Sequence, residues 1–366
     1  MQNTHSYTPA ERTARAKLSA SFFKKGVILA TLSGIFYGLY TAFVTLAMST
    51  GVWGDWYGYN VAMLSAFTIT FTIGALGSAI NYTLSSVWGL GIAGFKGKVG
   101  EVWRSFNSKP GRILTIAALI GGPISTAAYV IGLQLAGSII VPIAALCPAV
   151  GTLLGKIFYK QHINKRMVFG LFVCFLAALL IGVQAIEPDA PPQMLLGIGI
   201  AFIAAVGWGF EGVVGGRATV MIDYEIGIVI RQVVSGLAGL VILFPLFALL
   251  GNMIDPDGVS AMQLFVDALT DGPAMLFFFV SSFFALYAFS LWYKGNAMCG
   301  TALGMALNGA FSFWGPFFCW IVLGLVVGQE GWDLSGLSWF AAVLMFVGIL
   351  FIATNPMELF KKKEVA

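Results

Sequence analysis

The chain has very few charged residues, and this shortage excludes a water-soluble globular fold. Only 10% of its 366 residues are Asp, Glu, Lys or Arg, whereas 58% are hydrophobic. Soluble domains carry about 25% charged residues. So few charges cannot cover a chain of this length with a water-compatible surface, so lipid must cover much of it. We therefore predict an all-α integral membrane protein.

Histidine and cysteine are also scarce, which argues against metal and nucleophile chemistry inside the membrane. The two histidines, His5 and His162, fall in segments predicted to be cytoplasmic. This placement leaves no histidine for a metal site or a Ser-His-Asp triad at membrane depth. The four cysteines lie in apolar runs and form no CxxC pair. We expect no metal, no cofactor and no enzyme activity.

Long apolar stretches divide the chain into ten predicted transmembrane helices. Crossing about 30 Å of hydrocarbon takes about 20 residues. Residues 1–20 are polar and lack the apolar core of a signal peptide, so the first stretch is expected to be retained. The predicted spans are 26–50, 59–83, 113–134, 137–159, 167–185, 194–214, 224–250, 273–294, 299–327 and 336–355.

The charges that do occur are separated by sign along this series of helices. The connections on the side of the N-terminus hold all the lysines and arginines near helix ends, including the run Lys361–Lys363. The opposite loops hold only acidic charges, among them Asp55, Glu187, Asp189, Asp255, Asp257, Asp267, Asp271, Glu330 and Asp333. Because basic residues stay in the cytoplasm, both ends are predicted inside, with cytoplasmic tails at 1–25 and 357–366.

Two connections have an amphipathic character of their own. Residues 95–112 combine basic side chains with Trp103 and Phe106, a pattern typical of a helix on anionic lipid. The loop 251–272 has an amphipathic centre at 260–265 that predicts a short interfacial helix. Trp53 and Trp56 are expected to be interfacial anchors.

A weak internal repeat relates the two halves of the chain. The windows 129–155 and 293–319 align without a gap, so that Tyr129 pairs with Tyr293 and Gly151 with Gly315. The windows lie five helices apart, and because five is odd the halves would cross the bilayer in opposite senses. We predict two inverted five-helix halves, 26–185 and 194–356, an arrangement that suits alternating access around a midplane cavity.

The segment 129–170 resembles the drug/metabolite transporter superfamily of the EamA-like ten-helix type. The features that carry the resemblance are the Gly137-Ser138 turn, the prolines Pro142 and Pro148 of the next helix, and Gly170. Gln161 departs from the pattern, because an acidic residue is usual there. The resemblance implies a transporter architecture but no particular substrate, since the superfamily carries amino acids, sugars, nucleotide sugars and quaternary amines.

Two ionisable side chains are predicted at membrane depth, where charges are costly and usually functional. Arg231 follows Asp223 by about 12 Å of helix at 1.5 Å per residue, close to the midplane. Its guanidinium suits an anionic group on a substrate, although a structural role beside Glu211 is the alternative. Glu211 is a candidate for proton coupling or gating, or else a partner of Arg217 or Arg231.

Aromatic and amide side chains on other helices complete the predicted substrate site. Their rings can stack on a sugar, a nucleobase or a cation, and their polar atoms can bind a solute. Buried Ser, Thr and aromatic residues also serve plain helix packing. The predicted substrate-binding residues besides Arg231 are Asn308, Tyr37, Tyr40, Tyr129, Trp208 and Gln232.

These features predict a multi-pass transporter of the inner (cytoplasmic) membrane that moves a small polar metabolite by alternating access. An amino acid, a sugar or a related anionic or zwitterionic solute is expected, with proton coupling and facilitated diffusion both open. The alternatives are an exporter of drugs or of cationic or aromatic metabolites, an intramembrane enzyme, or a channel. We expect the lipid bilayer and a small molecule as partners and no nucleic acid. The chain is expected to be a monomer or a homodimer.

Overall fold

The described chain is entirely helical and matches the apolar stretches of the sequence. The computed structural model describes residues 9–58, 64–160, 163–184, 192–219, 221–256, 258–299 and 301–353, and these residues contain no β-strand. Six helices among them are long and apolar enough to cross a membrane, and they are Ala20–Ala47, Lys109–Ala144, Met194–Gly216, Tyr224–Ile254, Gly272–Cys299 and Gly304–Val326. The protein is therefore an α-helical, multi-pass membrane protein.

Some features discussed above lie outside the described residues. They are the tail 357–366, both histidines, Gln161, Glu187, Asp189 and Asp257. The side chain of Arg217 also lies outside this description.

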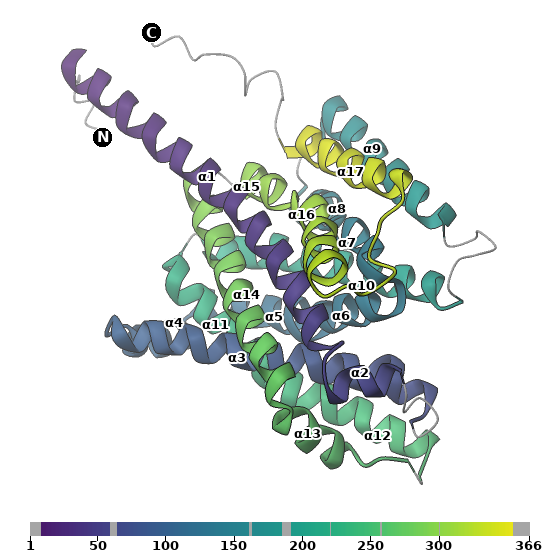
Figure 1. The fold of residues 1–366 in the computed structure, drawn as a ribbon. Helices are drawn as coiled ribbons and strands as arrows, with labels where there is room; N and C mark the ends of the chain where they lie inside the picture. Colours follow the sequence, from purple (N-terminus) through teal and green to yellow (C-terminus); the bar gives the residue numbers. More distant parts are fainter. Residues whose placement is uncertain are drawn as a thin grey trace.

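The first half of the chain forms a long helix followed by several shorter ones. Helix α1 spans Pro9–Ala47, and its N-terminal end projects beyond the other helices (Figure 1). The next elements are α2 (Val52–Tyr57), η2 (Thr68–Thr72), α3 (Ile73–Phe95), α4 (Val99–Phe106), α5 (Lys109–Leu119), η3 (Ile120–Ile124), α6 (Ser125–Ala136), η4 (Gly137–Ile139), α7 (Ile140–Ala144), α8 (Cys147–Tyr159) and α9 (Lys165–Gln184).

The second half has longer unbroken helices. Its elements are α10 (Met194–Thr219), α11 (Tyr224–Ala238), η5 (Gly239–Leu243), α12 (Phe244–Ile254), α13 (Ala261–Thr270), α14 (Gly272–Cys299), α15 (Thr301–Asn308), α16 (Phe311–Cys319), η6 (Trp320–Val326) and α17 (Gly336–Ala353). Four segments, η2, η3, η5 and η6, are π-helical turns inside longer helices. Such turns occur mostly as single insertions and often near functional sites.

Helices from the two halves pack against one another throughout the molecule. Helix α1 packs along α14 and α16, α3 packs on α11, and α10 packs on α6 and α8. Helices α9 and α17 form a pair at one corner (Figure 1). The α1–α16 contact is close, because a Cβ at Gly38 would lie 2.6 Å from the Trp314 carbonyl oxygen. Small residues allow such approaches between membrane helices.

Segments from predicted outer loops contact each other at the start of α14, and segments from predicted inner connections do so near its other end. At its start the Asp271 carboxylate accepts a hydrogen bond of 2.6 Å from the Val52 amide. Near its other end Lys294 shares a pocket with Lys96 and Glu225. The two sets of contacts lie at opposite ends of this helix.

Three short helices, α13, α4 and α2, lie in connections whose character was predicted from the sequence. The amphipathic centre of the 251–272 loop is helix α13, capped by the Ser260 hydroxyl, and the 95–112 connection contains helix α4. The prediction for Trp53 and Trp56 as interfacial anchors is wrong, because both are buried. Helix α2 folds inward, so that the Trp53 ring packs 5.0 Å from the Phe278 ring.

Candidate functional site

The centre of the molecule holds a buried ion pair between α11 and α10. Arg231 is 0% exposed and Glu211 is 2% exposed. The guanidinium donates from Nε and Nη2 to the two carboxylate oxygens, with 2.9 Å between Nη2 and Oε2. Bidentate pairs of this kind fix geometry as well as charge. The two charges of the pair balance each other. The sequence allowed either Arg217 or Arg231 as the partner of Glu211, and in the structure the partner is Arg231.

The remaining guanidinium surface of Arg231 connects this pair to the first half. Nη1 donates to the Tyr82 hydroxyl at 3.2 Å and to Gln232 Oε1 at 3.3 Å. The Tyr82 hydroxyl also lies 2.7 Å from the Thr126 hydroxyl on α6. The Phe289 ring covers the guanidinium, with 3.7 Å from Cζ to the ring centroid. Side chains from α3, α6 and α14 therefore hold a charge that α11 carries.

The π-helical turn η3 brings its backbone against this pair. Gly121 and Pro123 lie within η3, and a Cβ on Gly121 would run into the Glu211 carboxylate. The Gly121 carbonyl oxygen accepts a hydrogen bond of 2.8 Å from Trp208 Nε1. Glycine is required here because the carboxylate fills the space that any side chain would take. Trp208 thus has a hydrogen-bonding role in addition to its ring.

An aromatic cluster lies beside the ion pair. The Tyr37 ring centroid is 4.4 Å from that of Phe311, 5.2 Å from Tyr40, 5.8 Å from Tyr129 and 5.9 Å from Trp208. These rings come from α1, α6, α10 and α16, and therefore from both halves. The Tyr129 hydroxyl is satisfied by the Thr41 hydroxyl at 2.6 Å. The cluster can present ring faces to a flat or cationic group.

A small cavity of about 30 Å³ opens between the ion pair and these rings. A cavity needs about 10–15 Å³ to hold a water molecule, so this one has room for little more than water. In this structure the site is therefore too narrow for an organic solute. The cavity is lined by Tyr37, Cys147, Pro148, Trp208, Glu211, Phe289, Trp292, Met305, Asn308 and Phe311.

Several buried polar atoms around the site have no hydrogen-bond partner within the described part of the chain. They are the hydroxyls of Tyr37 and Tyr40, Nε2 of Gln232 and Nε1 of Trp292. An unsatisfied buried polar group costs about 1–3 kcal/mol. These groups can therefore accept or donate hydrogen bonds to water or to the polar atoms of a solute.

All eight residues predicted for the site lie in this region. Tyr37, Trp208, Glu211 and Asn308 line the cavity itself, while Arg231, Gln232, Tyr40 and Tyr129 contact those residues or one another. Asn308 has a structural bond too, since its amide donates to the Ser33 hydroxyl at 2.9 Å. The functional roles of these residues stay predictions.

The sequence prediction omitted Tyr82 and Phe289, which the structure places against the Arg231 guanidinium. For Tyr82 the available signal was a tyrosine inside an apolar helix, because its hydroxyl needs a hydrogen-bond partner at membrane depth. A phenylalanine in an apolar helix gives no signal of this kind. In the described residues, no group of three or more His, Cys, Asp or Glu side chains could hold a metal ion.

Comparisons with known proteins give no family. No protein-family model matches the chain, and no curated protein matches it either. A solved structure described only as "Crystal structure of protein" is similar over 91% of this chain and 98% of its own, with 21% sequence identity and a TM-score of 0.48.

Proposed function

We propose that the protein is a secondary transporter that moves a small polar organic solute across the cytoplasmic membrane by alternating access. Its substrate would carry a negative or zwitterionic group. The observation that carries the proposal is the closed Arg231–Glu211 pair, surrounded by aromatic rings and unpartnered polar atoms from both halves. Membrane charges that face the protein interior usually mark a substrate or ion path.

The pattern of helix contacts supports two related halves. If α1, α3, the helix α5-η3-α6, α8 and α9 are exchanged with α10, α11, α14, α16 and α17, the main contacts map onto one another. The α1–α14 contact becomes α10–α6, α1–α16 becomes α10–α8, and α3–α14 becomes α11–α5. The α3–α11 and α9–α17 contacts map onto themselves. We propose ten transmembrane helices in two inverted five-helix halves, with both ends in the cytoplasm.

The ion pair suggests how a substrate would be recognised. A carboxylate or phosphate on the solute would accept from the Arg231 guanidinium in place of Glu211. Glu211, released from its partner in a buried site, would then take up a proton, because an unpaired buried carboxylate is costly. Proton uptake by Glu211 would make transport depend on pH. If the solute is zwitterionic, its cationic group would pair with Glu211 in place of a proton, and transport would then be exchange without proton coupling.

The resemblance to the EamA-like drug/metabolite transporters belongs to this proposal. It rests on Gly137, Ser138, Pro142, Pro148 and Gly170 and on the helix order. In the fold these residues form the turn η4, helices α7 and α8, and the glycine of α9 that approaches α17.

Counterflow in liposomes tests the proposal. Candidate solutes are first selected by thermal stabilisation of the purified protein against a metabolite library. Saturable exchange of a selected anionic or zwitterionic solute is expected, with Arg231→Gln and Glu211→Gln both inactive. Ohmic flux would indicate a channel and product formation an enzyme. Exchange at the wild-type rate by Arg231→Gln would contradict the proposed site. Exchange at the wild-type rate with unchanged pH dependence in Glu211→Gln would exclude a coupling role for Glu211.

A second candidate is an exporter of cationic aromatic compounds. The ring cluster around Tyr37 and the carboxylate of Glu211 favour it, since cations bind over aromatic faces. A fluorescent quaternary ammonium dye separates the two candidates. Export of the dye that survives Arg231→Gln and is lost in Trp208→Ala would favour this second function.

A further inference from the structure

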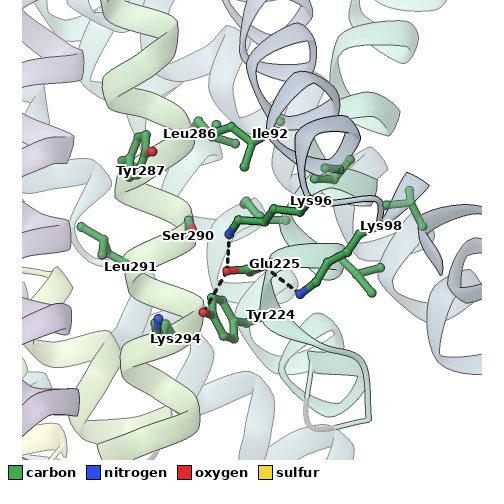
Figure 2. A pocket seen from close by; sticks show the side chains of 16 residues that line it. Ile92, Lys96, Lys98, Tyr224, Glu225, Leu286, Tyr287, Ser290, Leu291 and Lys294 are labelled. Atoms are coloured by element: carbon green, nitrogen blue, oxygen red, sulfur yellow. Dashed lines mark hydrogen bonds and ion pairs between the residues drawn. The ribbon is translucent and has the colours of Figure 1, made fainter. Parts of the chain in front are cut away.

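A second pocket lies apart from the central site, between α3, α4, α11 and α14. It has a volume of about 170 Å³, and none of its lining residues lines the central cavity. Figure 2 shows side chains from α3 and α14 facing each other across it, with Glu225 of α11 between them. Its lining residues include Gly89, Ile92, Lys96, Lys98, Tyr224, Glu225, Val229, Leu286, Tyr287, Ser290, Leu291 and Lys294.

The polar part of this pocket is basic. Three lysines and one glutamate line it, which leaves an excess of positive charge. Lys96 and Lys98 both contact Glu225, with Nζ–Oε distances of 2.8 and 2.9 Å. Lys294 has no carboxylate partner among the described residues, and its Nζ lies 4.7 Å from the Tyr224 ring centroid. One ammonium group is therefore available to an anion.

The other wall of the pocket is apolar. Ile92, Val229 and Leu286 line it, and Figure 2 shows Ile92 and Leu286 above Lys96. Gly89 belongs to this wall, because a Cβ there would touch Val229 at 3.4 Å and Leu286 at 3.5 Å. One part of the pocket is therefore apolar and is formed by side chains of α3 and α14. The other part is charged and lies where α3 ends and α11 begins.

The surface beside the pocket has the character of a membrane interface. Phe95 is 96% exposed, Trp103 is 68% exposed and Val99 is 49% exposed, all next to basic side chains of the α3–α4 region. Exposed aromatic and apolar groups among lysines and arginines are typical of segments at the level of lipid headgroups. The same level contains the pocket, because Lys96 and Lys98 immediately precede α4.

We propose that this pocket binds one anionic phospholipid from the adjacent leaflet. The phosphate would lie against Lys294 and Lys96, with hydroxyl groups of Ser290 and Tyr287 beside it. The first part of an acyl chain would lie on Ile92 and Leu286. A free phosphate ion would leave the apolar wall uncovered, and a lipid without net negative charge would gain little from the excess of lysine. The bound lipid would join α3 of the first half to α14 of the second.

The test compares lipids by thermal unfolding and native mass spectrometry of the full-length protein in nonionic detergent. Phosphatidylglycerol is expected to raise the melting temperature more than phosphatidylcholine and to remain bound as one molecule. Lys294→Gln should weaken phosphatidylglycerol binding about fivefold, the effect of one lysine near an anionic surface. Lys156→Gln is the matched control, because it removes an exposed lysine from α8, outside the pocket.

Several outcomes would overturn the proposal. Equal stabilisation by the two lipids would exclude an anion-selective site, and full stabilisation by inorganic phosphate or glycerol phosphate would assign a soluble anion instead. Equal effects of Lys294→Gln and Lys156→Gln would exclude this pocket. If Lys294→Gln does not fold, Gly89→Leu replaces it, because its side chain would fill the apolar wall and should release the lipid while leaving every lysine in place. Retention of the lipid by Gly89→Leu would contradict the proposed acyl position.

Discussion

Two carboxylates of the second half, Glu211 and Glu225, bind basic side chains in opposite environments. The Glu211 and Arg231 side chains are 1% and 0% exposed, whereas those of Glu225, Lys96 and Lys98 are 28%, 48% and 32% exposed. Exposed pairs gain little, because water screens them. Buried pairs often stabilise less than apolar residues of the same size, because removing both charges from water is costly. The comparison shows that the stabilising contribution of the central pair depends on keeping both partners, whereas that of the outer pairs is limited by water.

The largest expected effect comes from removing one member of the central pair. Glu211→Gln should lower the free energy of unfolding by about 3 to 5 kcal/mol, because Arg231 would be left charged and unpaired in the interior. Replacing both residues, as in Glu211→Leu with Arg231→Met, should recover most of this loss yet abolish transport. Denaturant unfolding in micelles measures both variants. A double variant as unstable as the single one would show that the pair is itself needed for the fold.

Next in size is the difference between two buried tyrosines at the site. Tyr82→Phe removes a hydroxyl that accepts from Arg231 and pairs with Thr126, so a loss of about 1.5 to 3 kcal/mol is expected. Tyr37→Phe removes a hydroxyl without a partner in the described chain, so stability should hardly change. Tyr37→Phe should instead weaken substrate affinity in counterflow. A large loss of stability in Tyr37→Phe, with unchanged affinity, would contradict a ligand role for this hydroxyl.

A smaller loss of stability is expected from a substitution at Gly121, the glycine beside the central pair, and a matched control is available for it. Gly121→Ala should cost about 1 to 3 kcal/mol, because its Cβ would displace the Glu211 carboxylate. Gly91→Ala on α3 is the matched control, since a Cβ there meets no atom within 4 Å. That control should keep or slightly raise the melting temperature, because alanine favours helix over glycine. Equal losses in both variants would show that the carboxylate can move aside.

The smallest effect is expected at the outer cluster. Glu225→Gln should change stability far less than Glu211→Gln, and the difference from wild type should shrink further at high salt. Melting curves at low and high ionic strength measure it. A large effect that salt does not reduce would place Glu225 in a drier environment than its exposure indicates.

The pH dependence of the outer cluster follows from Lys98. Its hydrogen bond to Glu225 raises the pKa of the Lys98 ammonium above its usual value. A raised pKa in the folded protein stabilises the fold at pH values below the usual pKa of lysine, and this contribution is lost as the pH rises through the folded value. Melting curves between pH 7 and 9 should therefore show no change from Lys98.

The sequence predicted the helices and the charged residues at the centre. It did not predict the partners of these charges, the exact helix ends or the burial of Trp53. Arg231 and Glu211 were predictable because charges at membrane depth need partners. Their actual pairing depends on the approach of α10 and α11, which no local pattern encodes. The second predicted helix, 59–83, runs on in the structure as α3 to Phe95, because the apolar character of the sequence continues through Val87, Trp88 and Leu90. Trp53 was misassigned because an interfacial and a buried tryptophan have the same sequence context.

The π-helical turn η3 has a consequence for the phase of its helix. A π turn contains one residue more than an α turn, so loss of that residue would rotate everything after it by about 100° about the helix axis. Thr126 and Tyr129 follow η3 directly and would both turn away from Tyr82 and Tyr37. The number of residues between Leu119 and Ser125 therefore determines which face of the helix the site residues after η3 occupy.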